Sequence, residues 1–320
     1  MRITSSLIRR GFLNLYRHSF DIPEYFSFFY FWMMTVDEVY RHFVTRLKAI
    51  YDERESKNIA DWVFESIAGI KRLRRVTEKD EVLVNPTGNQ LQLALQQLLE
   101  HRPVQYVLGE AWFYKMKLKV NEHVLIPRPE TEELVEWVVE EVRIERALYP
   151  PPTVLDIGTG CGCIAIALKK ELPSAAVRAV DVSEGALILA RQNASEQNAA
   201  IVFVQLDFLD EASWDQFPSF DIIISNPPYI PETQKMNMAK HVVDYEPHIA
   251  LFVTDDDPFI FYKKIAAFAH THLKERGSIF VEVHEAYAIS VQQIFVEKEL
   301  KTEIKKDLFG RERMIRAYKG

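Results

Sequence analysis

The run Asn226-Pro227-Pro228-Tyr229 places an amide, two prolines and an aromatic ring directly after an apolar stretch. Each proline lacks a backbone N–H and restricts its φ angle, so the loop offers carbonyl acceptors on a rigid backbone. The Asn226 side-chain oxygen and the Pro227 carbonyl can accept the two hydrogens of a planar nitrogen, while Tyr229 packs on its plane. These groups suit an amide or aryl amine, whose lone pair is delocalised, oriented for in-line attack on a methyl sulfonium.

A glycine-rich run closes an earlier apolar stretch, and Asp156, Gly158 and Gly160 form a D-x-G-x-G pattern within it. Glycine allows a tight turn and lets a ligand approach the end of a first strand, where open α/β sheets bind ligands. The third glycine of the dinucleotide motif G-x-G-x-x-G is here Cys163, which argues against a nicotinamide cofactor. The pattern instead resembles the S-adenosylmethionine loop of methyltransferases; a glycine-rich turn without any ligand is the alternative.

Acidic residues also end the next two predicted strands. Asp181 follows Asp156 at close to the spacing of about 20 residues at which an acid binds ribose hydroxyls. Asp207 can accept a hydrogen bond from the exocyclic amino group of adenine, and Phe208 can lie against the ring. One such acid is weak evidence, because acids often cap helices. Three at successive strand ends favour a nucleoside-containing cofactor.

The elements that position these residues are strands alternating with helices after Pro152, a pattern that predicts an α/β fold with a mainly parallel sheet. The expected strands are 153–157, 177–182, 201–205, 220–225 and 278–283, with a helix over 164–172. Two last strands, which start near Glu303 and Arg313, are expected to pair at one edge.

The chain before this sheet divides into three predicted parts. Residues 1–33 form an extension that we expect to be disordered or a start-site artefact; its aromatic run is too short for a membrane span of about 20 residues. Residues 34–105 form a helical domain that opens with a capping box between Thr35 and Glu38. Residues 106–130 are a β-hairpin, with a turn at Asn121, and a linker. Residues 131–320 form the domain that carries the motifs.

Composition limits the class of partner. The net charge of −7 gives no basic surplus for indiscriminate nucleic-acid binding. The two cysteines, Cys161 and Cys163, are too close for a disulfide and too few for a zinc site, and His270 and His272 lack ligand spacing. We therefore expect a cytoplasmic protein without metal, membrane or direct nucleic-acid contact.

With these motifs identified, the chain resembles the protein N5-glutamine methyltransferases of the release factor glutamine methyltransferase (HemK/PrmC) type. The resemblance runs from Thr35 to Gly320 and includes 103–109, 126–133 and 307–311. It implies a Rossmann-like, mainly parallel seven-stranded S-adenosylmethionine-dependent methyltransferase fold with a small N-terminal helical domain and a connecting β-hairpin. The implied substrate is the glutamine of the Gly-Gly-Gln motif in class 1 peptide chain release factors, which the helical domain helps to hold. We expect a monomer.

The resemblance also assigns roles to single residues. The cofactor set is Asp156, Gly158, Thr159, Gly160, Asp181, Asp207, Phe208 and Asn226. The substrate set is Asn226, Pro227, Pro228 and Tyr229, and Asn226, Pro227 and Tyr229 are the expected catalytic residues. Phe208 departs from the pattern, since many relatives carry tryptophan there.

Two rival functions remain at this point. An amino-methyltransferase acting on adenine or cytosine in DNA uses the same Asn-Pro-Pro-Tyr solution after base flipping; the acidic balance opposes it. A non-catalytic module that binds the cofactor without transfer is the second, and the intact loop at Asn226–Tyr229 opposes that one.

Overall fold

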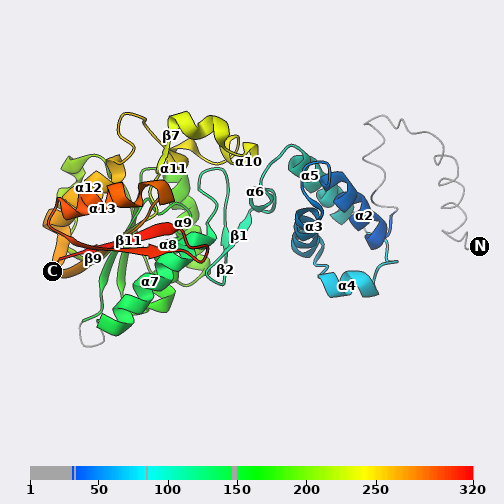
Figure 1. The fold of residues 1–320 in the computed structure, drawn as a ribbon. Helices are drawn as coiled ribbons and strands as arrows, with labels where there is room; N and C mark the ends of the chain where they lie inside the picture. The colour runs from blue at the N-terminus through cyan, green and yellow to red at the C-terminus, as the bar shows by residue number, and fades with distance from the viewer. Residues whose placement is uncertain (1–30, 32–33, 84–85, 146–149, 320) are drawn as a thin grey trace, which may run out of the picture. The chain divides into compact units, whose positions relative to one another are not determined.

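The computed structural model describes residues 31, 34–83, 86–145 and 150–319. The chain separates into two compact units, Met1–Leu108 and Gly109–Gly320, and each is described by itself (Figure 1).

The first unit is helical, as its periodicity predicts. Its helices are α2 (Val36–Leu47), α3 (Glu53–Ala68), α4 (Arg72–Thr77), α5 (Thr87–Leu99) and α6 (Val104–Leu108). The capping box is confirmed: the Thr35 hydroxyl accepts from the Glu38 N–H at 3.3 Å, and the Glu38 carboxylate accepts from the Thr35 N–H at 2.8 Å. The rings of Phe43 and Phe64 meet edge to face in the core of this unit.

One described residue of the predicted extension contacts this helical core. Phe31 is 5% exposed, and its ring meets the His42 ring edge-on at 5.5 Å between centroids. The remainder of the predicted extension, 1–30 and 32–33, lies outside the described residues.

The predicted β-hairpin is present, but its turn differs from the expected one. Strands β1 (Glu110–Phe113) and β2 (Met116–Lys119) pair antiparallel, with Phe113 opposite Met116. The connecting residues Tyr114 and Lys115 both have positive φ, at 47° and 63°. Two-residue hairpin turns of this kind usually carry Asn-Gly, so Tyr-Lys gave no sequence signal. The Asn121 turn lies beyond β2, where its side chain accepts from the His123 N–H.

The mainly parallel seven-stranded sheet is confirmed. Its order is β10-β11-β9-β6-β3-β4-β5. The strands are β3 (Thr153–Ile157), β4 (Ala176–Asp181), β5 (Val202–Gln205), β6 (Phe220–Ser225), β9 (Leu273–Glu282), β10 (Lys301–Lys306) and β11 (Glu312–Tyr318). Strands β10 and β11 pair antiparallel at the edge, as predicted. Strand β9 begins five residues earlier than expected, because a register shift beside Phe220 joins Leu273 to the ladder.

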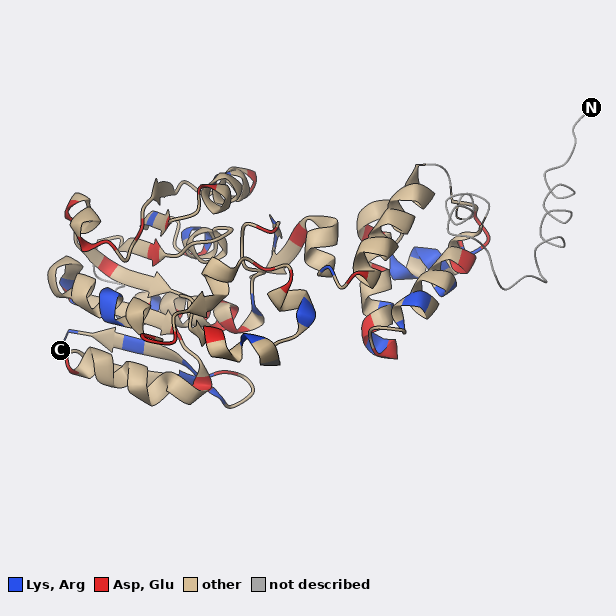
Figure 2. Cartoon of the chain, turned by 90° about the horizontal axis from the view of Figure 1, so that it is seen from above, with Lys and Arg blue, Asp and Glu red and all other residues tan. Residues whose placement is uncertain are grey.

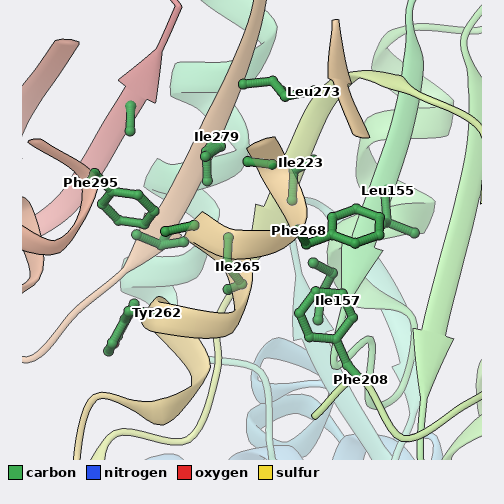
Figure 3. Close-up of a cluster of buried hydrophobic side chains, with 14 of the residues drawn as sticks. Leu155, Ile157, Phe208, Ile223, Tyr262, Ile265, Phe268, Leu273, Ile279 and Phe295 are labelled. Atoms are coloured by element: carbon green, nitrogen blue, oxygen red, sulfur yellow. The ribbon is translucent and has the colours of Figure 1, made fainter. Parts of the chain in front are cut away.

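Helices cover both faces of this sheet (Figure 1). Helices α7 (Pro129–Glu145), α8 (Cys163–Glu171) and α9 (Glu184–Glu196) lie on one face, and α12 (Ile260–His272) and α13 (Ala288–Val296) lie on the other. Alternate residues of β9 serve the two faces: Phe280 meets Trp137 of α7, while Ile279 joins the cluster around Phe268 of α12 (Figure 3). The sheet is therefore buried on both faces, as parallel sheets usually are.

Short elements follow β5, β6 and β9. They are η3 (Glu211–Gln216), β7 (Ile230–Pro231), η4 (Glu232–Asn237), α10 (Lys240–Val243), α11 (His248–Leu251), β8 (Phe252–Val253) and η5 (Glu285–Tyr287). Acidic and basic residues are spread over the elements of both units (Figure 2).

Candidate active site

A cavity of about 240 Å³ lies at the carboxyl ends of the central strands in the second unit. The sequence-predicted residues that line it are Gly158, Thr159, Gly160, Asp181, Asp207, Phe208, Asn226 and Pro228. Asp156, Pro227 and Tyr229 are not among the residues that line it. Such a strand-end cavity is where open α/β sheets bind ligands.

Register explains why the motifs converge there. Ile157 of β3 pairs with Ser225 of β6, and Ser225 pairs with Val281 of β9. The residues that follow these partners therefore leave the sheet at one level. The glycine loop, Asn226 and Glu282 are brought together although they are far apart in the sequence.

The glycine loop needs its glycines for conformation. Gly158 and Gly160 have φ values of 72° and 54°, a region that L side chains rarely adopt. An added Cβ at either position would meet no atom within 4 Å, so space beside the backbone is open. The loop is held to β4 because the N–H groups of Gly158 and Thr159 both donate to the Val180 carbonyl. A ligand can therefore approach this backbone closely.

Asp156 supports this loop from behind. Its carboxyl is fully buried; Oδ2 accepts from the Thr159 hydroxyl at 2.6 Å, and Oδ1 has no partner among the described residues. Burial raises the pKa of Asp156 to about 7, against the Thr159 hydrogen bond, which lowers it. The sequence placed Asp156 on the cofactor; in the structure its nearest partner is the loop itself.

Asp181 lies at the cavity with both carboxylate oxygens engaged. Oδ2 accepts from the Gly160 N–H at 2.8 Å and Oδ1 from the Ser183 N–H at 2.9 Å. Burial raises the pKa of Asp181, while these backbone hydrogen bonds lower it. Each oxygen keeps a further lone pair for a ligand hydroxyl.

Asp207 and Phe208 differ in their surroundings. Asp207 is exposed at the cavity edge, and its Oδ1 accepts from the Leu209 N–H at 2.9 Å. Phe208 is 5% exposed and packs against Trp214 and Phe268, at 5.5 and 5.3 Å between centroids. The rings of Phe208 and Phe268 are labelled in Figure 3. Most of the Phe208 ring is therefore buried in the hydrophobic core, and only the part that faces the cavity is accessible to a ligand. Other apolar lining at the cavity includes Leu206, Leu209, Ile249 and Phe261.

Asn226 is held by a pair of residues that no local sequence pattern links. Its amide Nδ2 donates to the Thr131 hydroxyl at 3.0 Å, and that hydroxyl donates to Glu282 Oε2 at 2.6 Å. Glu282 is the last residue of β9, Asp181 is the last residue of β4, and Asp156 is the second-last residue of β3. The same sequence signal, an acidic residue at the end of a strand, could therefore have identified Glu282. Thr131 lies in the first turn of α7, within the segment that carried the resemblance.

Tyr229 and Tyr262 lie against the same glutamate. The Tyr229 hydroxyl donates to Glu282 Oε1 at 3.5 Å, and the Tyr262 hydroxyl donates to the Glu282 backbone carbonyl at 2.9 Å. Burial raises the pKa of Glu282 to about 7 and that of Tyr229 well above its usual 10.0. Tyr229 is therefore a neutral phenol, suited to packing and hydrogen bonding.

A second buried glutamate anchors the loop before α7. Glu246, 3% exposed, accepts from Arg128 Nη2 at 2.6 Å and from the Ile126 N–H at 3.1 Å. Pro127 and Arg128 line the cavity, so this ion pair holds one of its walls. No local pattern in the sequence paired Arg128 with Glu246.

The described ranges contain neither a candidate metal site nor a candidate membrane span. Within them, no three His, Cys, Asp or Glu side chains are grouped so that they could hold a metal ion. None of the helices there is long and apolar enough to cross a membrane. Cys161 and Cys163 are free thiols beside the cavity.

Comparison with known proteins extends over both units. The family model described as PrmC N-terminal domain matches residues 38–109, and that of the methyltransferase small domain matches residues 144–247. A release factor glutamine methyltransferase of Flavobacterium psychrophilum is 40% identical over 284 residues, which cover 88% of this chain and 99% of the relative. One of Bacteroides thetaiotaomicron is 39% identical over 272 residues, 85% of this chain and 95% of the relative. A solved methyltransferase from Pyrococcus furiosus has a TM-score of 0.45 at 18% identity, covering 65% of this chain and 90% of that one.

Proposed function

Since the chain belongs to the release factor glutamine methyltransferase family, we propose that it methylates the side-chain nitrogen, N5, of the glutamine in the Gly-Gly-Gln motif of class 1 release factors. We propose S-adenosylmethionine as the methyl donor. The observation that carries the proposal is that Asn226, an amide that can hold the substrate nitrogen, lines the same cavity as Gly160 and Asp181.

The cavity lining fits S-adenosylmethionine in its chemistry. Lone pairs of Asp181 can accept from ribose hydroxyls, and Asp207 can accept from the adenine amino group. Leu206, Leu209 and Phe208 supply apolar surface for the base. The open space beside Gly158 and Gly160 admits the methionine portion, and Asp156 holds Thr159 so that this loop keeps its shape. When bound, the cofactor supplies an electrophilic methyl group.

The protein's part in the reaction is to orient an amide nitrogen. The Asn226 amide donates to Thr131, which leaves Oδ1 free to accept one hydrogen of the substrate amide; the Pro227 carbonyl accepts the other. These two acceptors stabilise the positive charge that develops on the nitrogen as the methyl group is transferred. Pro228 shapes the wall and Tyr229 packs on the substrate plane. Once it carries the methyl group, the nitrogen is strongly acidic and loses one of its two protons to solvent, so positioning and electrostatics account for catalysis without a strong base.

The predicted helical domain, 34–105, is proposed to contact the release factor. Exposed apolar side chains support a contact role for this unit: Leu73 is 79% exposed and Val76 is 66% exposed. We further propose that the enzyme is monomeric and acts in the cytoplasm, where release factors are found.

The direct test is methyl transfer from labelled S-adenosylmethionine to purified release factor. A Gly-Gly-Ala variant of the factor and duplex DNA are the parallel substrates. Label on the wild-type factor alone is the expected result. Label on DNA would assign the protein to the nucleic-acid methyltransferases, and cofactor binding without label on any substrate would leave a non-catalytic module.

A further inference from the structure

Thr131 is the centre of a buried hydrogen-bond chain beside the cavity. Its hydroxyl lies 2.6 Å from Glu282 Oε2 and 3.0 Å from Asn226 Nδ2. Thr131 and Glu282 are each 2% exposed, so bulk water does not compete for these contacts. The chain joins residues of α7, β9 and the loop after β6, which are separated by 95 and 151 positions.

The direction of each hydrogen bond between Asn226, Thr131 and Glu282 follows from the number of protons that these groups can donate. An ionised carboxylate only accepts, so the single hydroxyl proton of Thr131 is committed to Glu282. The Thr131 oxygen is then available to Asn226 only as an acceptor. Asn226 must therefore turn its NH₂ group toward Thr131, which leaves Oδ1 on the opposite side of the amide.

We propose that Glu282 and Thr131 are positioning residues that lock the Asn226 amide with Oδ1 toward the methyl-accepting nitrogen. This inference rests on the proposed function, because it gives Oδ1 the role of acceptor for the substrate amide. Without the lock, the Thr131 hydroxyl can donate to Oδ1 and the amide can rotate. An NH₂ group would then face the NH₂ group of the substrate, two donors without an acceptor.

The protonation state of Glu282 decides whether the Asn226 amide is held in this one orientation, an arrangement we call the lock. When the Glu282 carboxyl is protonated, it can donate to Thr131, and the Thr131 proton is released for Asn226. Burial raises the pKa of Glu282 to about 7, so the lock is expected to close as pH rises through that value. The charged and titratable groups that face Glu282 are Glu130, Arg128, Arg313, Tyr229 and Tyr262.

Thr131→Val and Thr131→Ser form the first test, on the full-length protein at saturating S-adenosylmethionine. Valine keeps the shape but removes the hydroxyl, while serine keeps the hydroxyl. We expect Thr131→Val to lower kcat about 100-fold, the typical loss for one preorganised polar contact, and Thr131→Ser to stay near wild type. Cofactor affinity by calorimetry should be unchanged in both. Equal kcat in the two variants, each folded by thermal unfolding, would overturn the proposal.

The pH profile is the second test and uses Glu282→Gln. The glutamine amide can either donate to Thr131 or accept from it, so the direction of the Thr131 proton is no longer fixed at any pH. Wild-type kcat should rise through an apparent pKa near 7, and Glu282→Gln should show low kcat without that step. His284 does not account for the step, since burial and Arg313 lower its pKa below 6.5. If Glu282→Gln keeps the rise of kcat near pH 7, that rise belongs to another titrating group, and the proposed lock is overturned.

These outcomes separate the two proposals. If wild-type protein transfers no label to release factor, the proposed function fails, and the positioning role that rests on it fails as well. If wild-type protein is active while Thr131→Val matches Thr131→Ser, only the lock fails.

Discussion

Asn226 and Asp181 are side chains with separate tasks at one cavity. Asn226 faces the proposed substrate and is held by the Thr131 hydroxyl. Asp181 supports the glycine loop through Gly160, and its remaining lone pairs are proposed to accept from the cofactor. Because the two side chains are proposed to contact different ligands, removing each should affect a different kinetic quantity.

Asn226→Ala should lower kcat by about 100-fold, since one preorganised acceptor is lost, and leave cofactor affinity nearly unchanged. Asp181→Ala should act in the opposite way and weaken cofactor binding first. Turnover at saturating cofactor and calorimetric affinity are the two measurements. A comparable loss of cofactor affinity in Asn226→Ala would show that this residue holds the cofactor, and unchanged affinity in Asp181→Ala would remove its ribose role.

Asp156 links the site to stability through its proton. Its pKa is raised to about 7 by burial from an ordinary 3.8, so the folded protein binds more protons than the unfolded chain between those values. Its contribution to stability is therefore complete below pH 3.8 and lost as pH rises through about 7.

Asp156→Asn, which cannot ionise, should reduce the fall in Tm between pH 5 and pH 8 in the ligand-free protein. From pH 5 to pH 8 we expect its Tm to gain several degrees on that of wild type, because wild type loses about 1.4 kcal/mol per pH unit up to a pH of about 7. Glu282 has a pKa raised in the same direction, so a smaller slope remains in the variant. Parallel profiles for the two proteins would contradict the assignment.

At the scale of elements, the first turn of α9 is packed against the loop after β2. An added Cβ at Gly185 would lie 2.8 Å from His123 Cγ, and His123 lines the cavity. Alanine favours a helix over glycine by about 0.5–1 kcal/mol, whereas overpacking costs typically 1–3 kcal/mol. The steric term is therefore expected to exceed the gain in helix propensity.

Gly185→Ala should lower Tm and weaken cofactor binding several-fold by displacing His123. Ser195→Ala in the same helix is the matched control, because Ser195 is exposed and the change raises helix propensity without crowding. We expect the control to equal or slightly exceed wild type in Tm. A Gly185→Ala protein as stable as the control, with the same cofactor affinity, would show that the His123 loop adapts without cost.

At the scale of the whole molecule, the two units carry different parts of the proposed function. Every residue that lines the cavity lies between His123 and Phe261, within the second unit. The helical unit has its own core around Phe43 and Phe64. Cofactor binding should therefore depend on the second unit, and recognition of the release factor on both.

A chain that begins at Gly109 should bind S-adenosylmethionine with affinity within a few-fold of the full protein. Its KM for release factor should rise by about tenfold or more, equivalent to loss of about 1.4 kcal/mol of binding. Calorimetry and steady-state kinetics measure the two quantities. An unchanged KM would remove the helical unit from substrate recognition.

Local patterns in the sequence determined much of this protein. Alternating strands and helices after Pro152 predicted the sheet, the Thr35–Glu38 spacing predicted a helix start, and the strand-end residues from Asp156 to Asn226 predicted a ligand cavity. These signals are short-range, because periodicity, capping and strand-end position depend on neighbouring residues.

Only the tertiary structure decided which distant residues meet. The pairing of Ser225 with Val281 places Glu282 beside Asn226, and the start of α7 brings Thr131 between them. The burial of Phe208 among core aromatics follows from the packing of α12 on the sheet. Strand order, register and helix packing are set by burial over the whole unit, so the partners of a buried polar side chain cannot be read from its own segment.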